Sequence, residues 1–240
     1  MHILLLGASL DSLLLSHHFQ SRNYSVTIVD IEAEVGLPLH HPGRIINLDL
    51  ISNYFSQDQM EFLSLYENDD GWGCRWEWVL KHMAHQVIQG NVTCLLRTRV
   101  LNVEPEGDTF HVVVSSNERD LPTELTVDRI IDMQHKGYKT PGNLTHDVPP
   151  SVVQQFSYPA VEPWVGGMAL SSTLQQQNIE ADLLLKHADG LVELWWKGTP
   201  SWTPPNGFIE TCELHLPTDI DEISFDAIVR RAASFAQDIV

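Results

Sequence analysis

Basic residues are scarce in this chain, which has 14 Lys and Arg against 32 Asp and Glu and a formal net charge of −18 at pH 7. An acidic surface repels phosphate backbones and anionic lipid, so we predict neither a nucleic-acid nor a membrane partner. A bound dinucleotide stays compatible with this charge, because it is held by local backbone amides.

Cysteine is also rare. Cys74, Cys94 and Cys212 lie far apart, and no pair has the CxxC spacing. An odd number of scattered cysteines argues against a disulfide framework and favours a reduced, cytoplasmic setting. The apolar run at the N-terminus is too short to span a bilayer and has no basic leader, so we interpret it as a strand. The sequence has no Gly-x-Ser-x-Gly elbow, HExxH or P-loop, which leaves hydrolase and triphosphatase readings without support.

The first thirty residues carry the most informative pattern. They predict a strand (His2–Leu6), a turn (Gly7–Ser12), a helix (Leu13–Gln20) and a second strand (Ser25–Val29) that ends on Asp30. This order, with an acid about twenty residues after the turn, is typical of the βαβ unit that opens a dinucleotide-binding domain.

The glycines of that motif are degenerate, because only Gly7 stands where GxGxxG requires glycine. Ser9 takes the second position and Ser12 the third. Ser9 adds a side chain where a pyrophosphate would lie, although its hydroxyl can donate to an anion. Asp11 places a negative charge near the same anion. The alternative is a βαβ unit kept for its fold alone, with Asp11 or Ser12 as the helix cap.

The chain resembles the flavoprotein superfamily of aromatic hydroxylases, amine oxidases, sugar mutases and flavin-dependent halogenases. The resemblance covers about Met1–Gln134 and includes an acid at the end of the second strand, a Gly-containing loop and a following Arg: Asp30, Gly36 and Arg44. It implies FAD as cofactor, with the pyrophosphate near the turn, Asp30 on the ribose and Arg44 on a phosphate or the ring edge. The implied cofactor-binding residues are Gly7, Ser9, Ser12, Asp30 and Arg44.

The remaining periodicity predicts an α/β fold. A Rossmann-like FAD/NAD(P)-binding three-layer domain with a β-meander covers residues 1–140, and a small β-rich α+β domain of the substrate type covers residues 141–240. The expected helices are one or two within 47–68, then 73–89 and 223–240. The expected strands are 92–96, 99–103, 109–115, 124–131, 152–161, 166–172, 181–186, 191–197 and 208–216.

Two further departures from the family pattern concern the function. Residues 132–137 lack the Ala-Thr-Gly turn of many relatives, and nothing after Phe208 matches their Gly-Asp motif. Two hypotheses follow. The first is an FAD-dependent oxidoreductase acting on an unknown small molecule. The alternative is a non-catalytic binding or interaction module with a degenerate cofactor site. A homo-oligomer or a partner chain that completes the site is compatible with the missing motif.

A few side chains outside the motif are candidates for chemistry. His40 and His41 either orient a substrate near the cofactor or pack as loop residues. His82 and His85 share a helix face, but no third ligand accompanies them, so we predict no metal site. Cys74 lies at a helix start, where a thiol pKa can fall, and a buried inert thiol is the competing interpretation. Trp195 and Trp196 should point to opposite faces of a strand, one into the core and one toward the surface or an interface.

Overall fold

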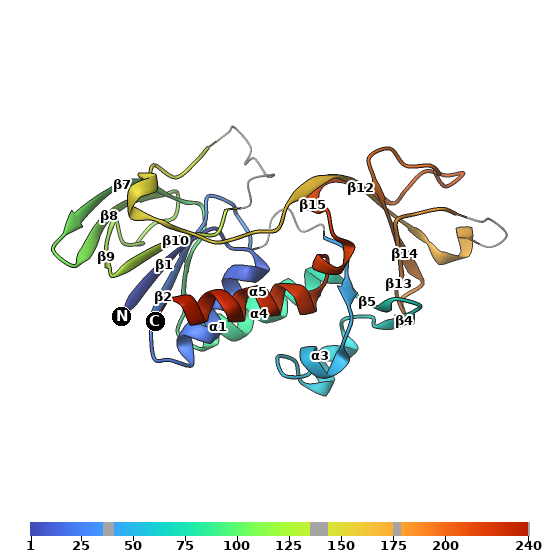
Figure 1. Ribbon diagram of the computed structural model, residues 1–240, viewed down its shortest axis with the longest axis horizontal. Coiled ribbons are helices and arrows are strands. Elements are labelled where there is room, and N and C mark those ends of the chain that lie inside the picture. Colours follow the sequence, from blue (N-terminus) through green and yellow to red (C-terminus); the bar gives the residue numbers. More distant parts are fainter. Residues whose placement is uncertain (36–40, 135–143, 175–178, 240) are drawn as a thin grey trace. The chain divides into compact units, whose positions relative to one another are not determined.

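The computed structural model in Figure 1 describes residues 1–35, 41–134, 144–174 and 179–239. The chain forms two compact units, each assembled from separate stretches of sequence. Unit 1 contains Met1–Leu37, Met83–Tyr158 and Val229–Val240, and unit 2 contains Pro38–His82 and Pro159–Ile228. This division differs from the predicted consecutive domains, 1–140 and 141–240. The physical reason is that the segment after the second strand bonds to strands far along the chain, which a local pattern does not reveal.

Unit 1 contains the predicted βαβ crossover, formed by β1 (His2–Leu6), α1 (Leu10–Gln20) and β2 (Ser25–Val29). The other strands of unit 1 are β6 (Thr93–Leu95), β7 (Thr98–Glu106), β8 (Thr109–Ser116), β9 (Glu124–Val127), β10 (Arg129–Asp132) and β11 (Gln154–Gln155), and a short 3-10 helix, η2, spans Pro150–Val152. Five parallel strands pair in the order β11-β10-β1-β2-β6, and β7, β8 and β9 form an antiparallel meander. The α/β fold class with a meander is therefore confirmed.

The strand predicted over 124–131 is in fact two strands in different sheets. β9 belongs to the meander and β10 pairs with β1. Asp128 sits between them and holds the crossing in place. Its amide donates to the His2 carbonyl at 2.8 Å, and its carboxylate accepts from the His2 amide at 2.5 Å.

The core of unit 1 lies on both faces of the parallel sheet. Alternate residues of β1, Leu4 and Leu6, pack with the meander in one apolar cluster. Ile3 and Leu5 are also fully buried and face the other way, as strand alternation requires. Figure 1 shows α1 beside the sheet, and Gln20 of α1 donates to the carbonyl of Val87 in α4 (Trp76–Gln89) at 3.1 Å. These contacts produce three layers.

Unit 2 combines two antiparallel sheets. The smaller has the order β3-β5-β4 and the larger the order β13-β14-β12-β15. Their strands are β3 (Arg44–Ile45), β4 (Tyr66–Asn68), β5 (Gly71–Gly73), β12 (Val161–Leu170), β13 (Leu183–Lys186), β14 (Leu191–Lys197) and β15 (Glu210–Pro217). Two short helices, α2 (Leu48–Ile51) and α3 (Gln57–Glu61), and two 3-10 helices, η3 (Ser171–Leu174) and η4 (Ile220–Glu222), complete it. The strands predicted over 152–161 and 166–172 were misplaced, because one strand, β12, runs through the gap between them.

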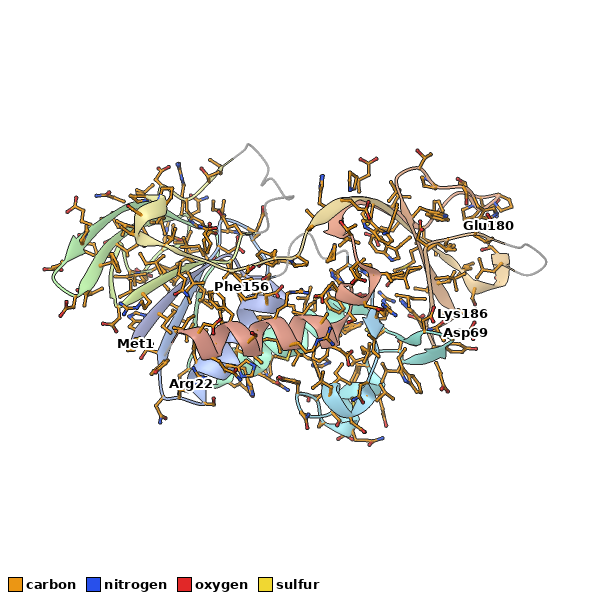
Figure 2. The ribbon with its side chains drawn as sticks, in the orientation of Figure 1. Met1, Arg22, Asp69, Phe156, Glu180 and Lys186 are labelled. Atoms are coloured by element: carbon orange, nitrogen blue, oxygen red, sulfur yellow. The ribbon has the colours of Figure 1, made fainter. Side chains whose placement is uncertain are left out.

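The two sheets of unit 2 are joined through Asn68. Its side chain donates to the Lys186 carbonyl at 3.3 Å and accepts from the Lys186 amide at 3.0 Å. Figure 2 labels Lys186 and Asp69 at this junction. The segment 41–75 therefore belongs with strands that follow it by more than a hundred residues.

Two longer helices each contribute residues to both units. They are α4 (Trp76–Gln89) and α5 (Phe225–Asp238), close to the predicted bounds of 73–89 and 223–240. Both are amphipathic, as their apolar spacing predicts. Among the described residues, no helix is long and apolar enough to cross a membrane.

Each face of the larger sheet in unit 2 carries an apolar cluster. Trp195 belongs to one cluster and Trp196 to the other, which confirms that they point to opposite faces. The expectation that one of them stays at the surface is wrong, because each is only 3% exposed. Other residues cover both faces of this sheet, so the two adjacent tryptophans of β14 are both buried.

Candidate functional site

The turn between β1 and α1 has the backbone form that the motif requires at its first glycine. Gly7 has φ of +108°, a region that side-chain-bearing residues rarely adopt. A Cβ at this position would lie 3.4 Å from the Met133 carbonyl group. Gly7 is therefore needed both for the turn and for the close approach of the chain after β10.

Asp30 lies at the end of β2, beside this turn. Its Oδ2 accepts from the Ala8 amide at 2.5 Å, and its Oδ1 accepts from the Glu32 amide at 2.9 Å. Burial raises the pKa of Asp30, and these amide hydrogen bonds oppose the rise. The carboxylate is thus fixed in orientation at the position that the sequence predicts.

Ser9, Ser12 and their backbone form a capping box at the start of α1. The Ser9 side chain accepts from the Ser12 amide at 3.3 Å, and the Ser12 hydroxyl accepts from the Ser9 amide at 3.2 Å. The Ser12 hydroxyl also donates to the Gly7 carbonyl at 2.6 Å. The alternative that Asp11 or Ser12 is the cap is wrong, since the N-cap is Ser9.

Asp11 occupies the first turn of α1 and is only 7% exposed. Burial raises the pKa of its carboxyl, an effect opposed by Arg231 and by a hydrogen bond from its own backbone amide. Arg231 belongs to α5, and its guanidinium nitrogen lies 3.5 Å from Asp11 Oδ1. A carboxylate of the protein therefore stands at the positive end of α1, where an anionic ligand of this motif would bind.

Tyr158 closes the same turn from another part of unit 1. Its hydroxyl donates to the Met133 carbonyl at 2.7 Å and is also hydrogen-bonded to the Ser9 side chain. Burial, reinforced by the charge of Asp11, raises the pKa of Tyr158 well above its usual value. The Ser9 hydroxyl is thus committed to internal partners.

The donors of the turn do not fit a diphosphate. The amide of Gly7 donates to the Val29 carbonyl, and the amides of Ala8, Ser9, Asp11 and Ser12 donate to side chains of the protein itself. A diphosphate is normally held by such amides and by the field of the helix N-terminus. Here both are used by the chain's own carboxylates and hydroxyls.

Gly7, Ser9, Ser12 and Asp30 lie together in unit 1, whereas Arg44 belongs to unit 2. Arg44 is buried, and its guanidinium donates to the Ile220 carbonyl at 2.7 Å and approaches the Asp221 carboxylate at 3.5 Å. The predicted role of Arg44 toward FAD stays a prediction.

Unit 2 contains a pocket of about 210 Å³ over the larger sheet. Its floor is one face of strands β12, β14 and β15, where Gly166 pairs with both Trp195 and Cys212. The rest of the lining comes from the segment before β3 and the start of α4. The lining residues are His41, Arg75, Trp76, Glu77, Gly166, Gly167, Met168, Glu193, Trp195, Glu210, Thr211 and Cys212.

Glu193 is the least expected residue of the pocket, because it is a carboxylate that is only 6% exposed. Its Oε2 accepts from the Gly43 amide at 3.1 Å and from the Trp195 indole at 3.0 Å. Its Oε1 lies 3.2 Å from Nε2 of His187, whose side chain is fully buried. Sequence reasoning missed Glu193, although an acid inside the apolar run of residues 191–196 is a signal for a buried charge.

The other candidates from the sequence have defined surroundings. The ring of His41 stacks on the ring of Trp76, with 4.4 Å between the ring centroids, and His41 lines the pocket. His40 is outside the described residues. Cys74 is a buried free thiol whose pKa is raised well above its usual value by burial and by nearby glutamates, so the inert interpretation is confirmed. His82 contacts aromatic rings, and within the described ranges no cluster of His, Cys, Asp and Glu could hold a metal ion.

No protein-family profile matches the chain, and no curated protein sequence is detectably similar to it. Several crystal structures share its fold. The p-nitrophenol 4-monooxygenase PnpA from Pseudomonas putida DLL-E4 has 9% identity and a TM-score of 0.65, over 98% of this chain and 78% of that one. A flavoprotein/dehydrogenase from Cytophaga hutchinsonii has 12% identity and a TM-score of 0.56, over 99% and 79%.

CabE, an aromatic hydroxylase from angucycline biosynthesis, has 11% identity and a TM-score of 0.51, over 85% of this chain. The chain spans about half the length of CabE, because only 46% of CabE is covered. At these identities the likeness concerns architecture. The chain therefore shares its fold with a p-nitrophenol 4-monooxygenase, an aromatic hydroxylase and a flavoprotein/dehydrogenase.

Proposed function

We propose that this chain is a small-molecule-binding module built on the flavoprotein fold, and that it does not hold FAD at the α1 turn. The observation that carries the proposal is Asp11, which stands at the start of α1 with Arg231 as its counter-ion. The binding function then rests on the pocket of unit 2, which combines aromatic walls with polar groups, as small-molecule sites do.

The electrostatic argument is one of like charges. Two unit charges 4 Å apart interact by about 4 kcal/mol at the effective dielectric constant of about 20 that suits protein sites. An ionised Asp11 alone would repel a diphosphate by this order, and its pairing with Arg231 reduces that repulsion. The ligand would have to displace this ion pair as well as the internal hydrogen bonds of the turn. Protonation of Asp11 relieves the repulsion, so any residual FAD affinity should increase as the pH falls.

The test compares the wild-type chain with the Ser9→Gly/Asp11→Ala/Ser12→Gly variant, which restores the family pattern at the turn. Isothermal titration calorimetry with FAD and the flavin absorbance after gel filtration are the measurements. We expect the wild type to be colourless and to take up no FAD, and the triple variant to gain FAD binding. The control is Asp49→Ala, which removes an exposed carboxylate from the first turn of α2 and should leave FAD binding absent.

Two results would overturn the proposal. The first is a yellow wild-type protein that releases flavin on denaturation. The second is a folded triple variant, verified by circular dichroism, that still takes up no FAD, because the turn would then not be the obstacle.

The second candidate function is an FAD-dependent oxidoreductase acting on a small molecule. Asp30 favours it, because this carboxylate lies at the end of β2 beside Gly7, the position from which relatives hold the adenosine ribose. In that case FAD would supply the redox chemistry, and the protein would supply binding and orientation. The activities for which PnpA and CabE are named, those of a p-nitrophenol 4-monooxygenase and an aromatic hydroxylase, are consistent with this candidate. The colour of the purified protein distinguishes the two.

A further inference from the structure

We propose that the pocket of unit 2 selectively binds a compact organic cation, preferably one built on a single aromatic ring. This inference rests on the proposed binding function and names the class of ligand. The observations that carry it are the charge of the lining, the engagement of its one permanent cation and the aromatic walls.

The lining of the pocket is acidic. Among the described residues that line it are three carboxylates, Glu77, Glu193 and Glu210, and one permanent cation, Arg75. With His41 neutral, the formal charge of the lining is −2. A concave site with one sign of charge and apolar walls concentrates ligands of the opposite sign.

Arg75 does not provide a binding site for an anionic ligand, because its guanidinium is already bonded to two carboxylates. Its Nε donates to Glu77 at 2.6 Å, and another nitrogen donates to Asp189 at 2.9 Å. A second contact with Glu77 is made by the third nitrogen. An anionic ligand would have to compete with both of these pairs.

Glu193 presents a carboxylate whose orientation is fixed before any ligand arrives. Its Oε2 accepts from the N–H groups of Gly43 and Trp195, and its Oε1 lies 3.2 Å from Nε2 of His187, so the orientation of the carboxylate is set by the protein. Because the side chain is almost completely buried, the charge is poorly screened by water. A carboxylate in this setting attracts a cation more strongly than one on an open surface.

Aromatic rings form two walls of the pocket. The Trp195 ring lies over Gly166, where a Cβ would come within 2.5 Å of the ring, so the floor exists only because that position has no side chain. Trp76, stacked with His41, stands on the other wall. Ring faces attract organic cations, and tryptophan does so best.

The size of the pocket limits the ligand. Pockets for drug-sized molecules have volumes of roughly 300–1,000 Å³, and this one has about 210 Å³. One ring with a short charged group is therefore the expected scale.

Benzamidine, benzamide and benzoate provide a matched test, because they share one shape and differ in charge from positive through neutral to negative. Binding to the full chain is measured by ligand-observed NMR and by calorimetry. We expect benzamidine to bind at least tenfold more tightly than benzamide, and benzoate to bind least. The Glu210→Gln variant should weaken benzamidine several-fold and leave benzamide unchanged. The control, Glu213→Gln, neutralises an exposed carboxylate on the opposite face of the same strand and should change neither.

The inference is overturned if benzamide or benzoate binds as well as benzamidine, if none of the three binds at millimolar concentration, or if the two variants behave alike. Melting temperatures of both variants verify that each remains folded. Its failure is separable from that of the proposed function, since uptake of FAD at the α1 turn is measured with a different ligand and different variants.

Discussion

His146 should make the stability of this protein sensitive to mild acid. The Val100 amide donates to its Nδ1 at 3.1 Å, and its Nε2 is buried with no hydrogen-bond partner among the described residues. The pKa of His146 is lowered to about 4, chiefly by burial and to a smaller extent by Arg99, while Asp132 and Asp147 act in the opposite direction. Protonation would disrupt the hydrogen bond from Val100, because Nδ1 would become a donor.

The direction of the effect follows from the two pKa values. In the unfolded chain the pKa of His146 is about 6.5, so between pH 6.5 and pH 4 the unfolded state binds more protons than the folded state. The contribution to stability is fully present above pH 6.5 and is lost as the pH falls toward 4. The loss reaches about 2 kcal/mol at pH 5 and approaches about 3 kcal/mol below pH 4.

The measurement is urea unfolding of the wild type and of His146→Asn at pH 7.5 and pH 5.0. Asparagine retains an acceptor near Nδ1 and does not titrate, so the wild type should lose about 2 kcal/mol more than the variant over this interval. His85→Asn replaces an exposed histidine and should follow the wild type. Equal losses for the wild type and His146→Asn would refute the reasoning.

Two further predictions concern the framework of unit 2. Gly43→Ala should lower the free energy of unfolding by about 3 kcal/mol, because the new Cβ would lie 1.8 Å from the Cys74 carbonyl oxygen. Gly107→Ala, at φ +62° with open space around it, should lose only about 1 kcal/mol, and similar losses in the two variants would contradict the steric argument. Asp226→Asn should lose about 2 kcal/mol, because this buried carboxylate accepts two backbone amides just before α2, at 2.7 and 3.0 Å. Asp221→Asn alters an exposed carboxylate, so its free energy of unfolding should stay within about 0.5 kcal/mol of that of the wild type. Urea unfolding at pH 7.5 measures the stability of all four variants.

The turn shows how far a local motif predicts a site. Gly7, Ser9, Ser12 and Asp30 lie together because one short βαβ crossover contains them all. Arg231 was not predictable as a neighbour of this turn, because it follows Asp11 by 220 residues. Long-range pairs of this kind depend on how distant elements pack against each other. The spacing of apolar residues within either segment does not encode that packing.

The sequence alone determined most helices and strands, since the period of apolar residues and the turn glycine at Gly7 act over short distances. It also placed an acid at the end of β2 and indicated the flavoprotein architecture. Only the tertiary structure decided that segment 41–75 joins the later β-rich strands, that Asp11 meets Arg231, and that Glu193 lies buried beside a pocket. The physical reason is that burial and charge pairing depend on contacts between distant segments. The periodicity of apolar residues indicates only which face of each segment is buried.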